Sequence, residues 1–321
     1  MLYPTLAARQ KEHTMKKNIL LLVNPNSGRG LSSGKLGDIV YRLALAGYNV
    51  TTRFTEKGRV PELAKKNGGK YPLLACVGGD GTLSEAVAGL MELDVKKRPV
   101  LGYIPNGTAN DMATTLALSS DVAEAVDTIL FGETIPLDIG RFNGGYFTYI
   151  AAFGAFTSVS YNTSQQAKKA LGHFAYVLGG IGELSAIKPR RTIVEYDGGV
   201  IDDSFIFGAV TNSTSVAGVV RLNESVVDLS DGKFEVMLIK NPMSIQELFE
   251  IMSSLSSRSY DSDNIKLLHT STVRFTFEEP VPWTRDGENG GEHMSLDISN
   301  CPRAITIIKR RQEQSLTEGK A

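Results

Sequence analysis

A glycine-rich turn that holds one acid, Gly78-Gly79-Asp80-Gly81-Thr82, is the stretch of this sequence whose residue types best suit chemistry on a phosphate. An apolar run precedes the turn, and apolar residues recur at the helical interval after it, so the sequence predicts a buried strand followed by a helix. Thr82 and Glu85 have the spacing of a capping box, which predicts that the helix begins at Thr82.

The start of such a helix attracts anions, because its first amides are unpaired and lie at the positive end of the helix dipole. Glycines also let a ligand approach the backbone closely. Asp80 would repel a phosphate unless a divalent cation lay between them, so the turn indicates a nucleotide with Mg²⁺. The alternative is a tight turn in an α/β core whose aspartate only caps a neighbouring amide, and the pattern matches neither G-x-G-x-x-G nor a Walker loop.

Two more loops of small polar residues follow apolar runs of the same kind. One is Asn24-Pro25-Asn26-Ser27-Gly28, and the other is Pro105-Asn106-Gly107-Thr108-Ala109-Asn110-Asp111. Because the carboxyl ends of parallel strands lie on one edge of a sheet, we expect loops 24–30, 78–82 and 105–111 to converge on one crevice and to surround a polyphosphate. Strand-to-helix loops use the same residue types for turns and caps, which leaves a purely structural role open.

Two groups of acids stand in the second half of the chain. Asp228 and Asp231 lie three residues apart on a loop that enters a strand, where they could share a cation or make an ordinary turn. Asp286-Gly287-Glu288 lies in a glycine-rich loop between Trp283 and a strand at Met294. Its structural alternative is a solvent-exposed hairpin loop.

The elements that must position these residues change in character near Asp138. Before it, strands alternate with helices, which predicts an α/β domain with a parallel sheet. After it, short β-rich runs alternate with turns, which predicts an antiparallel β-sandwich or barrel. These runs lie at residues 146–152, 192–196, 205–211, 234–239, 273–277, 294–298 and 304–308, and predicted helices at 168–187 and 244–255 interrupt them.

We therefore predict a nucleotide-binding domain at 15–137, to which 303–311 is expected to return, and a β-rich substrate domain at 138–302. A second substrate is expected in the cleft between them. Met15 looks like an alternative start, so residues 1–14 are expected to be a disordered extension or a start-site artefact.

Composition excludes several classes of protein. A net charge of −1 gives no long-range attraction to nucleic acid or to an anionic membrane. Cys76 and Cys301 are the only cysteines, which fits a reducing cytoplasm and argues against a disulfide framework. No run of eighteen apolar residues exists, so the sequence predicts no transmembrane segment.

Taken together, these motifs resemble the diacylglycerol kinase catalytic-domain family, which includes bacterial soluble lipid kinases and the sphingosine and ceramide kinases. The resemblance covers nearly the whole chain after Met15, and its specificity lies in the order and spacing of the motifs. The matching segments are residues 24–28, 78–82, 106–111, 137–140, 171–176 and 286–288.

The resemblance implies an N-terminal domain like those of NAD kinase and phosphofructokinase, followed by an antiparallel β-sandwich. It also implies transfer of phosphate from ATP, with Mg²⁺, to a lipid hydroxyl, with conversion of diacylglycerol to phosphatidic acid as the expected reaction. Asp286 matches the general base, and Asp80 and Glu288 match residues that act through the catalytic Mg²⁺.

The family's other sites carry over to two sets of positions. The expected nucleotide-binding residues are Asn24, Ser27, Gly28, Gly78, Gly79, Gly81, Thr82, Asn106, Gly107, Thr108 and Asn110. The expected ligands of a structural Mg²⁺ are Asp228, Asp231 and the main chain of Lys233.

One departure from the family concerns Thr114, which occupies a position where the family often has an arginine near the nucleotide. Arg29 or Lys168 could supply the missing cation. Because of this departure, a second hypothesis stays open: the chain is a catalytically impaired, nucleotide-binding regulatory protein. NAD kinase, which also uses a G-G-D-G-T turn, is the alternative enzyme.

A lipid acceptor implies a cytoplasmic protein that works at the membrane interface without an anchor. The apolar helix that contains Phe174 and Ile181 is a candidate surface for the lipid chains. The sequence leaves the acceptor open among diacylglycerol, phosphatidylglycerol, an undecaprenol-like alcohol and a sphingoid base. An exposed edge strand in either domain could also pair across a two-fold axis to form a homodimer.

Overall fold

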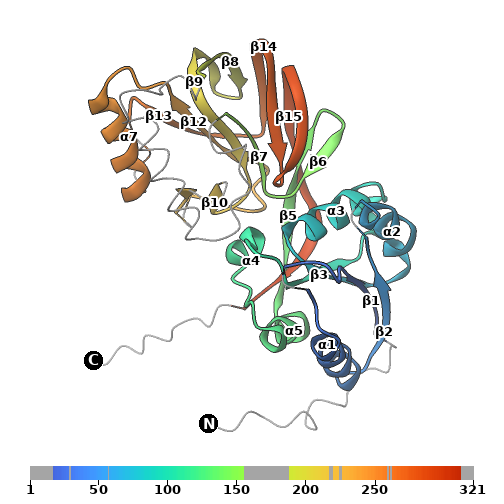
Figure 1. Cartoon of the computed structure of the whole chain (residues 1–321). Helices are drawn as coiled ribbons and strands as arrows, with labels where there is room; N and C mark the ends of the chain where they lie inside the picture. Colours follow the sequence, from blue (N-terminus) through green and yellow to red (C-terminus); the bar gives the residue numbers. More distant parts are fainter. Residues whose placement is uncertain are drawn as a thin grey trace, which may run out of the picture.

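The computed structural model describes residues 17–28, 30–56, 58–154, 188–216, 220–223, 226–258, 260 and 262–311. The expected extension at 1–14, the cations Arg29 and Lys168, and the predicted helix at 168–187 lie outside these described residues. Figure 1 shows two domains, with the N-terminal helices and strands below and a strand-rich domain above.

The first domain is built around four strands that pair in parallel in the order β4-β3-β1-β2. Their bounds are Lys17–Val23 (β1), Tyr48–Phe54 (β2), Leu73–Gly78 (β3) and Val100–Pro105 (β4). The uninterrupted apolar run of β1 fits a strand whose two faces are both covered by helices. Ile19 and Leu21 pack among residues of α1 and α5, and Leu20 and Leu22 pack among residues of α2 and α3.

The helices of this domain form two layers. Helices α1 (Ser33–Leu45) and α5 (Val122–Phe131) lie below the sheet in Figure 1, and α2 (Val60–Asn67) and α3 (Asp80–Met91) lie above it. Short helical turns η2 (Gly68–Lys70), η3 (Val95–Lys97) and α4 (Asp111–Thr115) complete it. Local caps fix the helix starts: the side chain of Ser32 accepts a hydrogen bond from the N–H of Lys35, and that of Asp121 accepts from the N–H groups of Ala123 and Glu124.

Helix α3 begins at Asp80, so the predicted start at Thr82 is wrong by two residues. Its N-cap is Gly79, which is extended and makes no side-chain cap. The two residues of the predicted capping box have other partners. The hydroxyl of Thr82 accepts from Asn24 Nδ2 at 3.1 Å, and the carboxylate of Glu85 accepts from the N–H of Gly58 at 3.1 Å. Long-range contacts therefore replace the local cap.

The second domain consists mainly of antiparallel strands. In Figure 1, helix α7 lies at the left of this domain. Its strands are β6 (Gly145–Phe147), β7 (Ile150–Gly154), β8 (Arg190–Tyr196), β9 (Gly199–Thr211), β10 (Ser215–Val216), β11 (Val220–Arg221), β12 (Phe234–Lys240), β13 (Ile265–Thr270) and β14 (Thr272–Arg285). An aromatic core fills this domain, with Phe153, Phe275 and Trp283 in edge-to-face or tilted contacts at 4.9–5.8 Å between ring centroids. The predicted helix at 244–255 is confirmed as α7 (Ile245–Ser257), with Ser244 as its N-cap.

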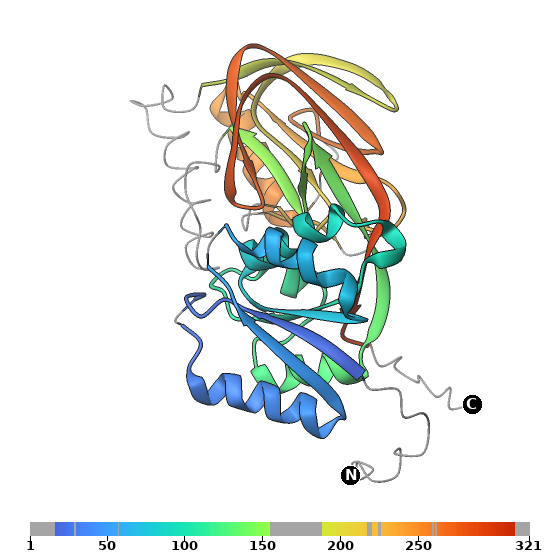
Figure 2. The ribbon, with the colours of Figure 1, turned by 90° about the vertical axis from the view of Figure 1, so that its right-hand side faces the viewer.

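Two long strands join the domains. Strand β5 (Glu133–Phe142) pairs along its length with β15 (Glu288–Lys309), so residue 138 lies inside a strand. Strand β15 returns to the first domain, where Ile307 pairs in parallel with Leu101 of β4. Figure 2 shows these two strands running side by side between the domains.

The separate strands predicted at 294–298 and 304–308 belong to this one strand, which also includes the predicted loop before Met294. The register of its pairing with β5 shifts between Cys301 and Ile305, and Arg303 has φ of 51°. A local irregularity therefore lets one strand pass through a stretch that contains Pro302.

Arg98 anchors the returning strand. Its guanidinium donates to the carbonyl oxygens of Ala304 at 2.7 Å, Met91 at 3.1 Å and Leu93 at 3.1 Å. The last turn of α3 is thereby tied to β15. No helix in the described ranges has the length and apolarity needed to cross a bilayer.

Candidate active site

The three loops at the carboxyl ends of β1, β3 and β4 lie together, which confirms their predicted convergence. Asn24 Nδ2 donates to Thr82 Oγ1 at 3.1 Å, which joins the first loop to the second. Asn106 Nδ2 donates to Ser27 Oγ at 3.0 Å, and the N–H of Asn106 donates to the carbonyl of Gly78 at 2.7 Å. Side chains that the sequence assigned to a ligand therefore also hold the loops to one another.

Glycines allow this close approach at two points. Gly28 has φ of +59°, and a Cβ there would overlap the carbonyl oxygen of Asn106. A Cβ on Gly107 would lie 2.5 Å from Gly79 Cα and 2.7 Å from Asn110 Oδ1. Gly81 differs, because a Cβ at that position would have no neighbour within 4 Å. Gly28 and Gly107 are required for loop packing, whereas Gly81 leaves open space beside the start of α3.

Asn110 organises the third loop from a left-handed conformation with φ of 54°. Its Oδ1 accepts from the N–H of Gly107 at 3.0 Å and from the hydroxyl of Tyr103 at 3.3 Å. Thr108 is exposed on this loop. Thr114, which stands where the family often has arginine, is exposed on α4, and its hydroxyl turns back to the carbonyl of Asn110 at 3.4 Å.

Asp80 is 8% exposed and joins the second loop to the third. Its carboxylate accepts from the N–H groups of Asp111 at 2.9 Å and Met112 at 3.1 Å. Burial, then the charge of Asp111 and that of Asp286, together raise the pKa of Asp80 to about 6. Negative charge is thus concentrated at this point of the first domain.

Asp286 approaches from the second domain and is 7% exposed. It occupies a two-residue turn between β14 and β15 in which both Asp286 and Gly287 have positive φ, 49° and 79°, as in a type I′ hairpin. The structural alternative, a solvent-exposed hairpin loop, is therefore half right: the turn is a tight hairpin, but the acid at its tip is buried.

The Asp286 carboxylate is held by three backbone N–H groups. Oδ2 accepts from Thr148 at 2.6 Å, and Oδ1 accepts from Tyr149 at 3.0 Å and Ile150 at 3.1 Å. These bonds lower the pKa of Asp286, but burial is the larger effect and raises it. They also explain why the predicted strand at 146–152 divides into β6 and β7, because residues 148 and 149 direct their N–H groups to this carboxylate.

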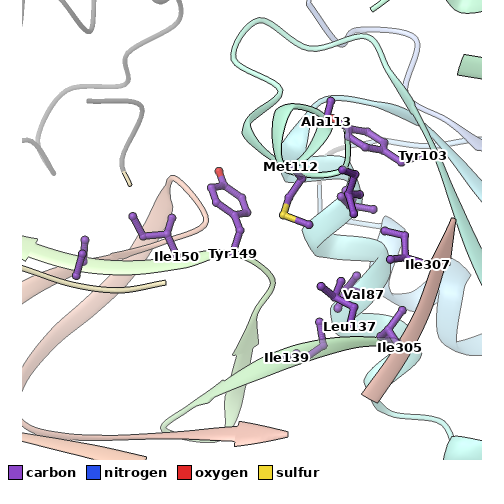
Figure 3. Close-up of a cluster of buried hydrophobic side chains, with 14 of the residues drawn as sticks. Val87, Tyr103, Met112, Ala113, Leu137, Ile139, Tyr149, Ile150, Ile305 and Ile307 are labelled. Atoms are coloured by element: carbon purple, nitrogen blue, oxygen red, sulfur yellow. The ribbon is translucent and has the colours of Figure 1, made fainter. Parts of the chain in front are cut away.

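Tyr149 lies between the two acids. In Figure 3 its ring stands up from the strand that holds Ile150, with the hydroxyl at the upper end of the ring and Met112 of α4 across from it. Burial raises the pKa of Tyr149 well above its ordinary value, and the charges of Asp80 and Asp286 act in the same direction. Residues from both domains therefore meet at this point.

The remaining predicted ligands lie in two places. Glu288 is exposed at the first position of β15. Asp228 and Asp231 lie on the loop before β12, where Asp231 Oδ2 contacts His269 Nε2 at 2.9 Å and Asp228 Oδ1 accepts from the N–H of Ser230 at 2.9 Å. Within the described ranges, no three His, Cys, Asp or Glu side chains are grouped so as to hold a metal ion.

The loop at 228–233 is fixed by Asp138, a fully buried acid in the middle of β5. Its carboxylate accepts from the N–H groups of Gly232 and Arg303, each at 2.6 Å. Asn300 Nδ2 donates to the same carboxylate at 3.3 Å and to the carbonyl of Lys233 at 3.1 Å. Asp138 thus holds this loop against the irregular part of β15.

Glu235, next to this loop, gives a prediction about pH. It is 2% exposed, and its Oε2 makes no hydrogen bond in the part of the chain that the structure describes. Burial, then the charges of Asp231 and Asp228, raise the pKa of Glu235 to about 8 from 4.5. Between these pH values the unfolded chain has lost this proton and the folded chain retains it, so the free energy of unfolding falls as pH rises through that window.

Glu235→Gln should remove this effect. The variant is expected to exceed the wild type in free energy of unfolding at pH 8.5 by on the order of 2–4 kcal/mol, with a much smaller difference at pH 4.5. Urea unfolding at the two pH values measures this, with the exposed Glu292→Gln as the control. Parallel pH profiles for Glu235→Gln and wild type would contradict the assignment.

Several residues of the site were not assigned from the sequence. Tyr103 and Tyr149 lie in apolar runs and resemble core residues, so no signal distinguished them. Ser215, whose hydroxyl donates to Asp111 Oδ1 at 2.8 Å, comes from a segment far along the chain. Asp138 had a signal, since a lone acid within Leu137-Asp138-Ile139-Gly140 is unusual in a buried strand.

Comparisons with known proteins agree over most of the chain. Residues 18–142 match the family model described as the diacylglycerol kinase catalytic domain, and residues 151–309 match the YegS C-terminal NAD kinase beta sandwich-like domain. A diacylglycerol kinase of Bacillus subtilis (strain 168) is 33% identical over 93% of this chain and 99% of its own length. A diacylglycerol kinase of Staphylococcus epidermidis is 34% identical over 92% of each.

A solved structure gives the same result. The crystal structure of a diacylglycerol kinase from Bacillus anthracis str. Sterne superimposes with a TM-score of 0.72 at 26% identity, covering 93% of this chain and 98% of that one. The similarity includes both domains and the strands that join them.

Proposed function

This chain belongs to the diacylglycerol kinase catalytic-domain family, and from that premise we propose that it transfers the γ-phosphate of ATP to a lipid hydroxyl, with diacylglycerol as the acceptor and phosphatidic acid as the product. Relatives of that name align over more than nine tenths of the chain, so NAD kinase is not favoured. The observation that best supports the proposal is the pair of buried acids, Asp80 and Asp286, which approach one another from different domains.

The nucleotide occupies the convergent loops. The open space beside Gly81 supports binding of phosphates at the start of α3, together with Gly78, Gly79 and Thr82. Asn24, Ser27, Asn106 and Asn110 shape the pocket through the bonds that join the loops. The remaining members of the binding set are Gly28, Gly107 and the exposed Thr108.

The donor chemistry of the site fits Mg²⁺. Both charges that raise the pKa of Asp80, those of Asp111 and Asp286, are carboxylates, and a divalent cation would offset them. Asp80 and Glu288 would hold the catalytic ion, which supplies positive charge for the phosphates. Oxygen donors also characterise the second set, Asp228, Asp231 and the carbonyl of Lys233, which we assign to a structural Mg²⁺.

Asp286 acts as the general base. Each carboxylate oxygen has two lone pairs, and the three backbone bonds use both of those on Oδ1 but only one on Oδ2. The remaining lone pair of Oδ2 takes the proton of the acceptor hydroxyl. As it does so, the acceptor oxygen bonds to the γ-phosphorus, and the bond between that phosphorus and the bridging oxygen breaks, which releases ADP. The backbone bonds fix the orientation of the base, and burial increases its affinity for the proton.

The domains divide this work. Residues 15–137 with 303–311 bind the nucleotide, and residues 138–302 bind the lipid. The protein works in the cytoplasm at the membrane surface, where the lipid chains remain in or near the bilayer. Strands β2 and β13 lie at the two ends of the sheet, and pairing through one of these edges would form a homodimer.

The test of function is transfer of label from [γ-³²P]ATP, with Mg²⁺, into a total lipid extract. We expect one labelled lipid that comigrates with phosphatidic acid, and a higher rate on long-chain diacylglycerol in vesicles than on a short soluble analogue. NAD is supplied in a parallel reaction. Label in NADP, or in no acceptor at all despite normal ATP binding, would overturn the proposal in favour of a NAD kinase or a regulatory protein.

A further inference from the structure

The hydroxyl of Tyr149 is an uncharged polar group on which the carboxylates of both domains act. Its residue is 6% exposed, and its backbone N–H is one of the donors that hold Asp286, at 3.0 Å from Oδ1. A Cβ on Gly287 would lie 3.9 Å from the Tyr149 hydroxyl oxygen. The hydroxyl therefore lies against the Asp286-Gly287 turn.

The other side of this hydroxyl faces the first domain. The groups whose charges act on it most strongly are Asp80, Asp286 and Asp111, in that order. Figure 3 shows Met112 of α4 across from the ring. Among the described residues the hydroxyl makes no hydrogen bond, although it is surrounded by elements of both domains.

A second buried tyrosine makes the contrast clear. Tyr103 also lies near Asp80, but its hydroxyl donates to Asn110 Oδ1 at 3.3 Å and so has a structural partner in the nucleotide loop. Among the residues that the structure describes, the Tyr149 hydroxyl has no such partner, so its proton is left to be donated to a ligand. The position of Tyr149 indicates which ligand that is.

We propose that Tyr149 is a further catalytic residue, whose hydroxyl donates a hydrogen bond to a non-bridging oxygen of the phosphoryl group during transfer. The inference rests on the proposed function, because that group must pass from the Asp80 side to the acceptor beside Asp286. Charge spreads over the three equatorial oxygens in the transition state, and surrounding carboxylates oppose it. A fixed neutral donor stabilises this charge, and the phenol retains its proton throughout.

Tyr149→Phe tests the proposal because it removes the hydroxyl and retains the ring. We expect kcat for diacylglycerol phosphorylation to fall about 10²-fold, with the KM values for ATP and for lipid changed less than about twofold. Thermal unfolding is measured on the same samples, and assays are run well below the transition. Tyr103→Phe should instead raise the KM for ATP, and Tyr196→Phe on β8 should match the wild type.

Two results would overturn the inference: an unchanged kcat, or a loss confined to the KM for lipid, which would make Tyr149 a lipid-positioning residue. Failure of the proposed function is separate, because wild-type protein would then label no lipid. In that case the rate of ATP hydrolysis decides on Tyr149 independently. Equal hydrolysis by wild type and Tyr149→Phe would exclude a role in phosphoryl transfer, and a slower rate in the variant would support it.

Discussion

Asp286→Asn is expected to lower kcat for phosphoryl transfer by about 10²–10⁴-fold, the range typical of a lost general base. The KM for ATP should change little, since the nucleotide loops belong to the other domain. Label transfer into diacylglycerol measures the rate. The exposed Asp297→Asn, on the same strand β15, is the matched control and should retain full activity.

The substitution will also affect the fold, which the sequence alone did not indicate. An asparagine places an NH₂ group against the N–H of Thr148 or that of Tyr149 and Ile150, where the carboxylate accepted hydrogen bonds. Leaving buried donors unsatisfied costs about 1–3 kcal/mol, so we expect a lower Tm as well. Activity is therefore compared at a temperature at which both proteins are folded. Near-normal turnover by folded Asp286→Asn would exclude Asp286 as the base.

Gly107→Ala is expected to weaken ATP binding strongly. Its methyl group would lie 2.5 Å from Gly79 Cα and 2.7 Å from Asn110 Oδ1, so the second and third loops must separate. Overpacking of this kind costs about 1–3 kcal/mol, which corresponds to a roughly 5–150-fold weaker Kd for ATP if the loops bind it only when packed together. Calorimetry of nucleotide binding measures the change.

The control for Gly107→Ala is Gly34→Ala in α1. A Cβ on Gly34 meets nothing within 4 Å, and alanine favours the helix, so neither affinity nor stability should fall. If Gly107→Ala binds ATP as tightly as the wild type, the contact between these loops has no part in the nucleotide site.

Much of the first domain could be predicted from the sequence because its strands and turns are specified by residues close together in the chain. The apolar runs before residues 24, 79 and 105 specify buried strands, and parallel strands place their loops on one edge. The start of α3 could not be predicted as well. Thr82 and Glu85 had the pattern of a capping box, but their partners are Asn24 and Gly58, which lie far away in sequence.

The second domain was harder because its decisive contacts are long-range. The structural alternative for Asp286-Gly287 was an exposed hairpin loop, and nothing local shows that its acid binds N–H groups at residues 148–150. Residues 301–303 fell between two predicted strands, 294–298 and 304–308, and a proline usually interrupts a ladder. There the N–H of Arg303 is satisfied by Asp138, far away in the sequence.

The return of β15 to the first domain has a consequence for how the protein is made. Ile305, Ile307 and Ile308 complete the cores on the two faces of the N-terminal sheet, yet the ribosome adds them roughly 200 residues after Leu101, beside which Ile307 pairs. During synthesis the nascent first domain therefore exposes the edge of β4 and an unfilled core until β15 has been made. The first domain therefore completes its fold only after the second domain has been synthesised, and a chain truncated just before residue 305 lacks part of the nucleotide domain.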